Sequence, residues 1–211
     1  MGMTMTEKIL ARASRRARVQ PGDLVVCTID RTVLLDLSFR SIAEDKRLLR
    51  LHDPEKVAIV LDHSVPAPTV VDAENHLRAR AFAKEFGIRH LYDVGAHGIC
   101  HQIIAEHALG LPGTMLACAD SHTCAAGALN CAARGTGSET LSILCTGQTW
   151  YRVGPTIQYT LEGMLPERLA PKDIFLHIAG TYGDHVNTNV EFSGPALATL
   201  STTTITFTPA N

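Results

Sequence analysis

Short apolar runs alternate along the chain with stretches that have helical periodicity. The runs are LVVCTI at 24–29, VAIVL at 57–61 and TMLACA at 114–119, and an Asp follows each of them. Short runs of this kind, rich in β-branched residues, are typical of buried strands. Their alternation with helices predicts an α/β fold with a mainly parallel sheet and flanking helices.

The segment DAENHLRARAFAKEFG at 72–87 predicts a helix. Asp72 is placed to cap its start, and Gly87 is placed to end it. Four apolar residues follow helical spacing and predict one buried face: Leu77, Ala81, Phe82 and Phe86.

Small residues dominate from 123 to 147, and they predict closely packed helices or turns interrupted by glycines. Within this stretch, RGTGSE at 134–139 could cradle a phosphate through backbone N–H groups. It lacks the P-loop Lys and the full dinucleotide-binding pattern. A glycine turn before a helix capped by Ser138 is the preferred interpretation.

The composition changes after Trp150. TIQYTLEG at 156–163 predicts an edge strand, and PKDIFLHIAG predicts a helix that opens with Pro171. We therefore expect a first α/β domain over 1–155, the start of a second, incomplete α/β domain over 156–200, and an irregular Thr-rich tail over 201–211.

Composition excludes several classes of protein. The 211 residues carry 19 Lys plus Arg against 21 Asp plus Glu, for a net charge of −2, so we expect neither a nucleic acid nor a membrane surface as a partner. No run of about 18 apolar residues predicts a membrane span. The six cysteines form no Cys-x-x-Cys, and no signal-peptide core is present, so we expect free thiols in a reducing compartment. The expected location is cytoplasmic, or mitochondrial if the source is eukaryotic.

Candidate chemistry gathers where predicted strands end. Asp62-His63 follows one apolar run and Asp120-Ser121-His122 follows another, while His101 stands in GICHQ. Ligands of open parallel sheets bind outside the carboxyl ends of the strands, so these clusters could meet at one rim. A carboxylate that accepts one imidazole N–H fixes the tautomer and leaves the other nitrogen to act as acid or base. A single Asp-His pair is more often an ordinary surface turn, and on spacing alone both interpretations stay open.

A zinc site is a weaker alternative. His97 and His101 stand four residues apart, which would put both on one face of a helix. Gly95 and Gly98 argue against a regular helix there, and no third ligand has diagnostic spacing.

Four segments together resemble the aconitase family of hydro-lyases. They are LDHSVPAPT, YDVGAHGICHQIIAE, LACADSHTCAAGAL and GTGSETLSILCTGQTW. The similarity is greatest to the large subunits of isopropylmalate dehydratase and homoaconitase, enzymes of amino-acid biosynthesis, and it extends from TEKILARAS to about Leu200. The resemblance implies a three-layer α/β/α fold.

The resemblance also implies site residues. Asp62 and His63 would assist loss or return of a hydroxyl, with His63 as the proton donor. His101 would pair with Asp120, Ser121 would bind a substrate carboxylate, and His122 would lie near an iron. The implied substrate is a small hydroxy di- or tricarboxylic acid that is dehydrated and rehydrated.

Such enzymes use a [4Fe–4S] cluster held by three cysteines, with one iron open to the substrate. A small, swivel-domain subunit is the implied partner in two-subunit members. None of the six cysteines here matches the cluster ligands, so metal ligands are not assigned in this chain, and we expect the isolated chain to be inactive.

The sequence departs from the family elsewhere too. Leu35 precedes Asp36 in IDRTVLLD, where related sequences usually carry a His. Two hypotheses remain open: the amino-terminal part of an iron–sulfur hydro-lyase large subunit, or a non-catalytic truncated remnant or interaction protein with the same fold. An incomplete gene model would look the same in sequence.

Overall fold

The structure is a computed structural model, and it describes residues 2–40, 42 and 48–200. The predicted Thr-rich tail at 201–211 lies outside the described residues. The α-helices are α1 (Met5–Ala13), α2 (Val70–Phe86), α3 (Cys100–Glu106), α4 (Thr140–Thr146) and α5 (Pro171–Tyr182). Short 3₁₀ helices are η1 (Asp36–Arg40), η3 (Pro54–Lys56), η4 (Thr123–Leu129) and η5 (Pro195–Thr199).

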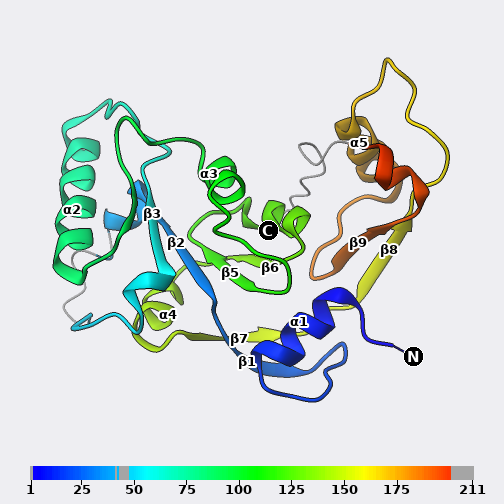
Figure 1. Cartoon of the computed structure of the whole chain (residues 1–211), viewed down its shortest axis with the longest axis horizontal. Coiled ribbons are helices and arrows are strands. Elements are labelled where there is room, and N and C mark those ends of the chain that lie inside the picture. Colours follow the sequence, from blue (N-terminus) through cyan, green and yellow to red (C-terminus); the bar gives the residue numbers. More distant parts are fainter. Residues whose placement is uncertain (1, 41, 43–47, 201–211) are drawn as a thin grey trace.

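A parallel sheet of five strands forms the centre of the larger part of the molecule (Figure 1). Its spatial order is β4-β3-β2-β5-β6, and every neighbouring pair is parallel. The strands are β2 (Arg31–Leu35), β3 (Val57–Val60), β4 (His90–Tyr92), β5 (Met115–Cys118) and β6 (Ala132–Gly135). The predicted α/β class with a mainly parallel sheet is confirmed.

Helices cover both faces of this sheet, which gives three layers. On one face, Leu34 and Ile59 pack with Phe82 of α2 and Leu144 of α4. On the other face, Val33, Leu35, Ala58 and Val60 pack with residues of α3 and η4, including Ile104 and Ala126. Since β3 and β5 are buried throughout, they can be continuous apolar runs without polar alternation.

The run at 24–29 is a strand, but it lies outside the central sheet. β1 (Leu24–Thr28) pairs antiparallel with β7 (Gln148–Arg152), and α1 packs beside it in a separate apolar cluster. The central position is taken by β2, which the sequence analysis did not identify. β2 contains Arg31 and Thr32, and these polar residues shorten its apolar run to three residues.

The helix α2 ends where predicted but starts earlier than predicted. Gly87 ends the helix in the left-handed conformation, as predicted, but Thr69 is the N-cap and accepts a hydrogen bond from the backbone N–H of Asp72. The predicted buried face is wrong at Leu77 and Ala81, which are exposed. The helix instead buries a face that is polar near its start and apolar near its end: Asp72, Asn75, His76, Ala79, Phe82 and Ala83.

The glycine-rich stretch 123–147 also differs from expectation. It contains strand β6 as well as η4 and α4, and Ser138 does not cap α4. Glu139 is the N-cap residue, and its side chain accepts a hydrogen bond from the backbone N–H of Gly137.

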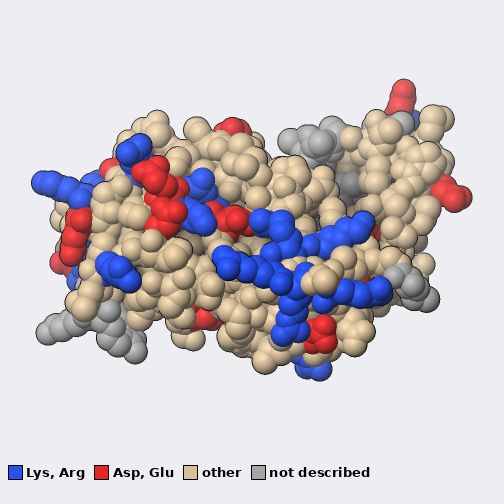
Figure 2. Space-filling view, turned by 60° about the horizontal axis from the view of Figure 1, so that its bottom comes forward, with Lys and Arg blue, Asp and Glu red and all other residues tan. Residues whose placement is uncertain are grey.

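The segment after 155 forms a small unit beside the sheet (Figure 1). β8 (Thr156–Thr160) pairs parallel with β9 (Asn189–Ser193), and α5 begins at Pro171 as predicted. No helix in the described part of the chain is both long and apolar enough to cross a bilayer. Figure 2 shows Lys and Arg side chains gathered on one face, around the region of α1 and β1.

Candidate active site

The candidate site lies at the carboxyl ends of three neighbouring strands. Asp36 follows β2, Asp62 and His63 follow β3, and Asp120 follows β5. The chain runs outward from β2 to β3 and β4, then returns to β5 on the other side of β2. Such a reversal in strand order opens a crevice at the carboxyl edge, where ligands of doubly wound sheets bind.

Asp120 is the centre of the site. Its Oδ1 lies 2.8 Å from Nε2 of His101, and its Oδ2 lies 3.5 Å from Nε2 of His63. The Asp120 side chain is 8% exposed, while that of His63 is 38% exposed. The site therefore holds a buried carboxylate between two imidazoles, one of which can reach a solvent-borne ligand.

His122 completes the cluster. Its backbone N–H donates to Oδ1 of Asp120 at 2.7 Å, and its Nδ1 lies 3.4 Å from the same oxygen and 3.2 Å from Oγ of Ser121. The His122 imidazole is 62% exposed, and its ring centroid lies 6.2 Å from that of His101. Residues predicted as separate clusters thus meet at one rim.

The pKa values of His101 and Asp120 are both shifted from their ordinary values. Burial disfavours the charged imidazole of His101, but hydrogen bonding and charge from Cys100 and Asp120 outweigh burial and raise its pKa. Asp120 supplies the charge, because contact with Cys118 and burial raise the pKa of the Cys100 thiol. Burial also disfavours the Asp120 carboxylate, yet the N–H of His122 and the imidazole of His101 outweigh it and lower its pKa. The geometry favours a charged imidazolium–carboxylate pair.

Asp62 connects the loop after β3 to the start of α3. Its Oδ2 accepts, at 2.9 Å, the backbone N–H of Cys100, which is the first residue of α3. The same oxygen lies 3.7 Å from Nδ1 of His63. One carboxylate therefore both anchors the start of the helix that carries His101 and borders the His63 ring.

Gly135 allows β6 to approach the Asp120 peptide. A Cβ at Gly135 would lie 2.6 Å from the backbone oxygen of Asp120, closer than real side chains permit. The next residue, Thr136, donates its backbone N–H to the carbonyl oxygen of Cys118. The turn that presents Asp120 is therefore packed directly against the end of β6.

Asp36 also contributes to the site, although it was not predicted as a functional residue. Its Oδ1 accepts the backbone N–H of His63 at 3.2 Å, and its Oδ2 accepts that of Ser64 at 2.8 Å. The available signal was the one used for Asp62 and Asp120, a carboxylate directly after an apolar run. It was missed because β2 was not recognised.

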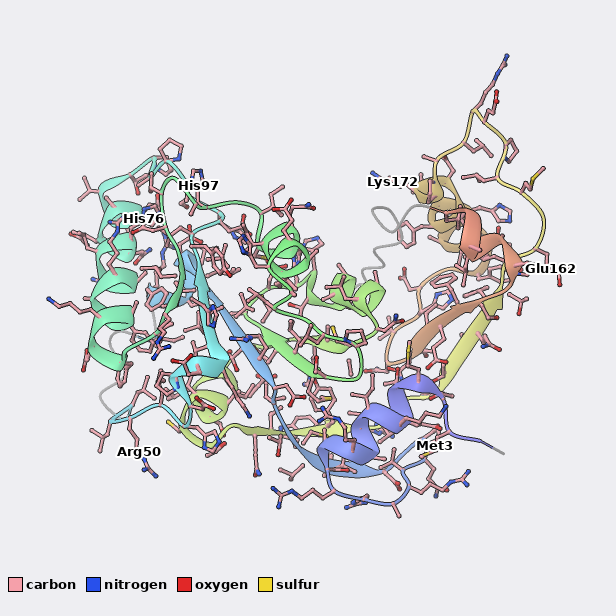
Figure 3. All side chains as sticks on the ribbon, viewed as in Figure 1. Met3, Arg50, His76, His97, Glu162 and Lys172 are labelled. Carbon is pink, nitrogen blue, oxygen red and sulfur yellow. The ribbon has the colours of Figure 1, made fainter. Side chains whose placement is uncertain are left out.

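The zinc alternative loses its geometric basis. His97 is exposed in the loop before α3, where its Nδ1 accepts the N–H of Gly95 (Figure 3). Among the described residues, the one group of three potential metal ligands with atoms within 4.8 Å is Cys100, His101 and Asp120. His97 is not in it, and the imidazole–carboxylate hydrogen bond and the buried thiol account for that grouping.

The cysteines of this chain do not fit an iron–sulfur cluster. All six are free, and four of them are buried: Cys27, Cys100, Cys118 and Cys131. Burial raises the pKa of Cys27, Cys124 and Cys131 to about 11. The four buried cysteines pack among the aliphatic side chains of two apolar clusters, where they serve as small core side chains.

A cavity of about 280 Å³ lies between residues packed near β6 and β7 and residues beyond 155. It is bordered by Leu10, Tyr151 and Cys131 on the side of the sheet and by Ile178 and His185 beyond residue 155. His63, His101, Asp120 and His122 do not line it, so the chemistry is located by side-chain geometry and not by the cavity.

Comparison with known proteins identifies the family. The aconitase family (aconitate hydratase) matches residues 7–208. The chain belongs to the aconitase family. It is 54% identical over 201 residues to the 3-isopropylmalate dehydratase large subunit of Mycolicibacterium smegmatis, covering 95% of this chain and 47% of the relative.

Archaeal relatives agree. The probable 3-isopropylmalate dehydratase large subunit of Methanothermobacter thermautotrophicus is 41% identical over 211 residues, with coverage of 95% and 49%. 3-isopropylmalate dehydratase large subunit 1 of Pyrococcus abyssi is 39% identical over 208 residues, with the same coverage. The chain spans about half the length of these relatives. The resemblance inferred from sequence is therefore confirmed.

Proposed function

We propose that this chain is the amino-terminal part of an iron–sulfur hydro-lyase large subunit. Its substrate would be a small hydroxy di- or tricarboxylic acid of the isopropylmalate or homoaconitate type. The observation that carries the proposal is the meeting of His63 and His101 at the two oxygens of Asp120. The names of its relatives supply the reaction class.

In this proposal, His63 is the proton donor to the departing hydroxyl. Hydroxide is a poor leaving group, so its loss needs a proton, and a positioned imidazole supplies one. His63 is more exposed than His101, the other imidazole whose Nε2 lies near Asp120, and Asp62 borders the other nitrogen of His63. At 3.7 and 3.5 Å the two carboxylates border the ring nitrogens at distances longer than those of ordinary hydrogen bonds, so a ring N–H of His63 remains available to donate its proton to a substrate oxygen.

His101 and Asp120 act as a fixed charged pair behind His63. The imidazolium of His101 neutralises Asp120, which then accepts the backbone N–H of His122 without carrying an uncompensated buried charge. Ser121, exposed beside His122, is assigned to a substrate carboxylate through its hydroxyl.

The [4Fe–4S] cluster would polarise the substrate hydroxyl and carboxylate as a Lewis acid. Since the cysteines present do not fit it, its ligands are assigned to the part of the large subunit that the relatives have beyond the matched half. A small subunit is the proposed partner, in line with the large-subunit names of the relatives.

A chimera tests the proposal. Residues 1–200 of this chain replace the matching half of the Mycolicibacterium smegmatis large subunit, and the chimera is assembled with a small subunit and iron–sulfur cluster. We expect dehydration of 3-isopropylmalate, and a fall in kcat of roughly a hundredfold or more in His63→Ala. His97→Ala, in an exposed loop, is the matched control.

The chimera also separates the alternatives. A folded chimera with its cluster loaded but without activity would favour the non-catalytic remnant. Full turnover in both His63→Ala and His122→Ala would remove the proposed roles of these residues.

A further inference from the structure

A buried carboxylate holds the loop that carries His63. Asp36 is 1% exposed, and both of its oxygens accept backbone N–H groups, those of His63 and Ser64. Loops after parallel strands are usually solvated. Here, two hydrogen bonds instead join the start of the loop after β3 to Asp36, at the end of the neighbouring strand β2.

His76 faces the same carboxylate from α2. Its Nε2 lies 3.8 Å from Oδ2 of Asp36, and the residue is 4% exposed. Figure 3 labels His76 on α2, and its burial places it on the side of the helix toward the sheet. At 3.8 Å the contact is electrostatic and not a hydrogen bond, and Nε2 has no hydrogen-bond partner among the described residues.

We propose that Asp36 and His76 are positioning residues for His63. The Asp36 carboxylate fixes the backbone at His63 and Ser64, and the His76 imidazole borders that carboxylate from α2. The imidazole of His63 is thereby held 3.5 Å from Asp120. The catalytic importance of this placement of His63 rests on the proposed function. The contact between Asp36 and the loop is independent of it.

The energetics favour this role. A carboxylate removed from water is costly unless it is hydrogen-bonded, and the backbone N–H groups of His63 and Ser64 supply these hydrogen bonds to Asp36. In Asp36→Asn, the backbone N–H groups of His63 and Ser64 would face a side-chain amide in place of a carboxylate. The amide nitrogen cannot accept a hydrogen bond. One of the two loop contacts must then be lost.

Asp36→Asn tests the inference, with Asp72→Asn as the control. Asp72 is a buried carboxylate of the same region, but its side chain contacts Thr69, the N-cap of α2, and Arg40, and no contact joins it to His63 or Ser64 among the described residues. In the 211-residue chain, NMR hydrogen exchange of the His63 and Ser64 amides is measured relative to the amide of Ile59. We expect at least one of the two amides to exchange roughly tenfold faster in Asp36→Asn, and neither to change in Asp72→Asn.

The chimera supplies the functional readout. Asp36→Asn should lower kcat by roughly tenfold or more with a smaller change in KM, and Asp72→Asn should leave both unchanged. If Asp36→Asn does not fold, His76→Phe replaces it and should speed exchange of the same amides by a smaller factor.

The outcomes are distinct. Unchanged exchange at His63 and Ser64 overturns the inference whatever the chimera does. Faster exchange with an unaltered kcat overturns the positioning role. A folded, cluster-loaded chimera without activity overturns the proposed function, and normal turnover after His63→Ala overturns the role of His63 within it. Both results are independent of the exchange measurement.

Discussion

At the residue scale, the site depends on one carboxylate that serves three partners. Asp120 contacts His101, His63 and the backbone N–H of His122. An Asp has two oxygens with about four acceptor positions, so these contacts are compatible. Removing its charge therefore affects several groups together.

Replacing Asp120 should change the pH dependence of stability. The pKa of His101 is raised above its ordinary value of 6.5, so its contribution is complete below 6.5 and disappears as pH rises through the folded value. The pKa of Asp120 is lowered below 3.8, so its contribution is present above 3.8 and disappears as pH falls through the folded value. The pair therefore stabilises the fold most between these limits.

We expect Asp120→Asn to lower the free energy of unfolding by about 2 kcal/mol near pH 5.5, and by less near pH 8.5. Urea unfolding at both pH values measures this. Asp30→Asn is the control, because the charged partner of Asp30 is the guanidinium of Arg12 and not an imidazole, and Asp30 also accepts the backbone N–H of Met115. An equal loss at both pH values in Asp120→Asn would contradict the assigned charge pair.

At the scale of elements, α2 differs most from its sequence pattern. Apolar spacing indicated Leu77 and Ala81, yet the helix buries Asn75 and His76 toward the sheet. The reason is the carboxyl edge, where Asp36 lies under the first turns of α2. Only the second half of the helix packs on apolar core.

A pair of substitutions on α2 tests which face is buried. Phe82 is 6% exposed and packs edge-on against Phe39, with ring centroids 5.4 Å apart. Phe82→Ala should lower the free energy of unfolding by about 3–5 kcal/mol. Leu77→Ala, at a position 63% exposed, should change it by less than about 0.5 kcal/mol. Comparable losses in the two variants, measured by chemical denaturation, would place the buried face where the sequence pattern put it.

The end of β6 provides a second test at this scale. Gly135→Ala would force the backbone oxygen of Asp120 to move, so we expect a loss of about 1–3 kcal/mol in stability together with a reduced kcat in the chimera. Gly127→Ala, where a Cβ has no atom within 4 Å, is the matched control. A fully active, equally stable Gly135→Ala would show that the close approach does not matter.

At the scale of the whole molecule, six large apolar side chains beyond residue 155 are exposed. These residues are Ile157, Met164, Leu169, Leu176, Tyr182 and Val186. A group of this kind is typical of a surface that another chain or segment covers. Residues before 155 also expose single apolar side chains, such as Leu24 and Val26, but they form three buried apolar clusters.

We therefore expect the 211-residue chain to self-associate and to bind a hydrophobic dye. Size-exclusion chromatography over a range of concentrations measures the first, and dye fluorescence the second. Combining Met164→Glu with Leu176→Glu should reduce both. Leu49→Glu, also at an exposed Leu, should not. A monomer with sharp, cooperative thermal unfolding and no dye binding would contradict the expectation.

The sequence by itself determined the α/β class, two of the central strands, the family and the residues of the histidine cluster. Runs such as 57–61 and 114–119 predict strands because fully buried strands need no polar alternation. The Asp residues that follow them mark the edge where ligands bind. Local composition was sufficient for these conclusions because each signal lies within a few residues.

Tertiary structure alone decided which strands are neighbours and which polar residues are buried. β2 lies between β3 and β5 although its own apolar run is short, and this position brings Asp36 beneath His63. Strand order and the pairing of Asp36 with His76, forty residues apart, depend on contacts between distant segments. No local pattern records such contacts, since the hydrogen bonds and burial that favour them exist only after the sheet has formed.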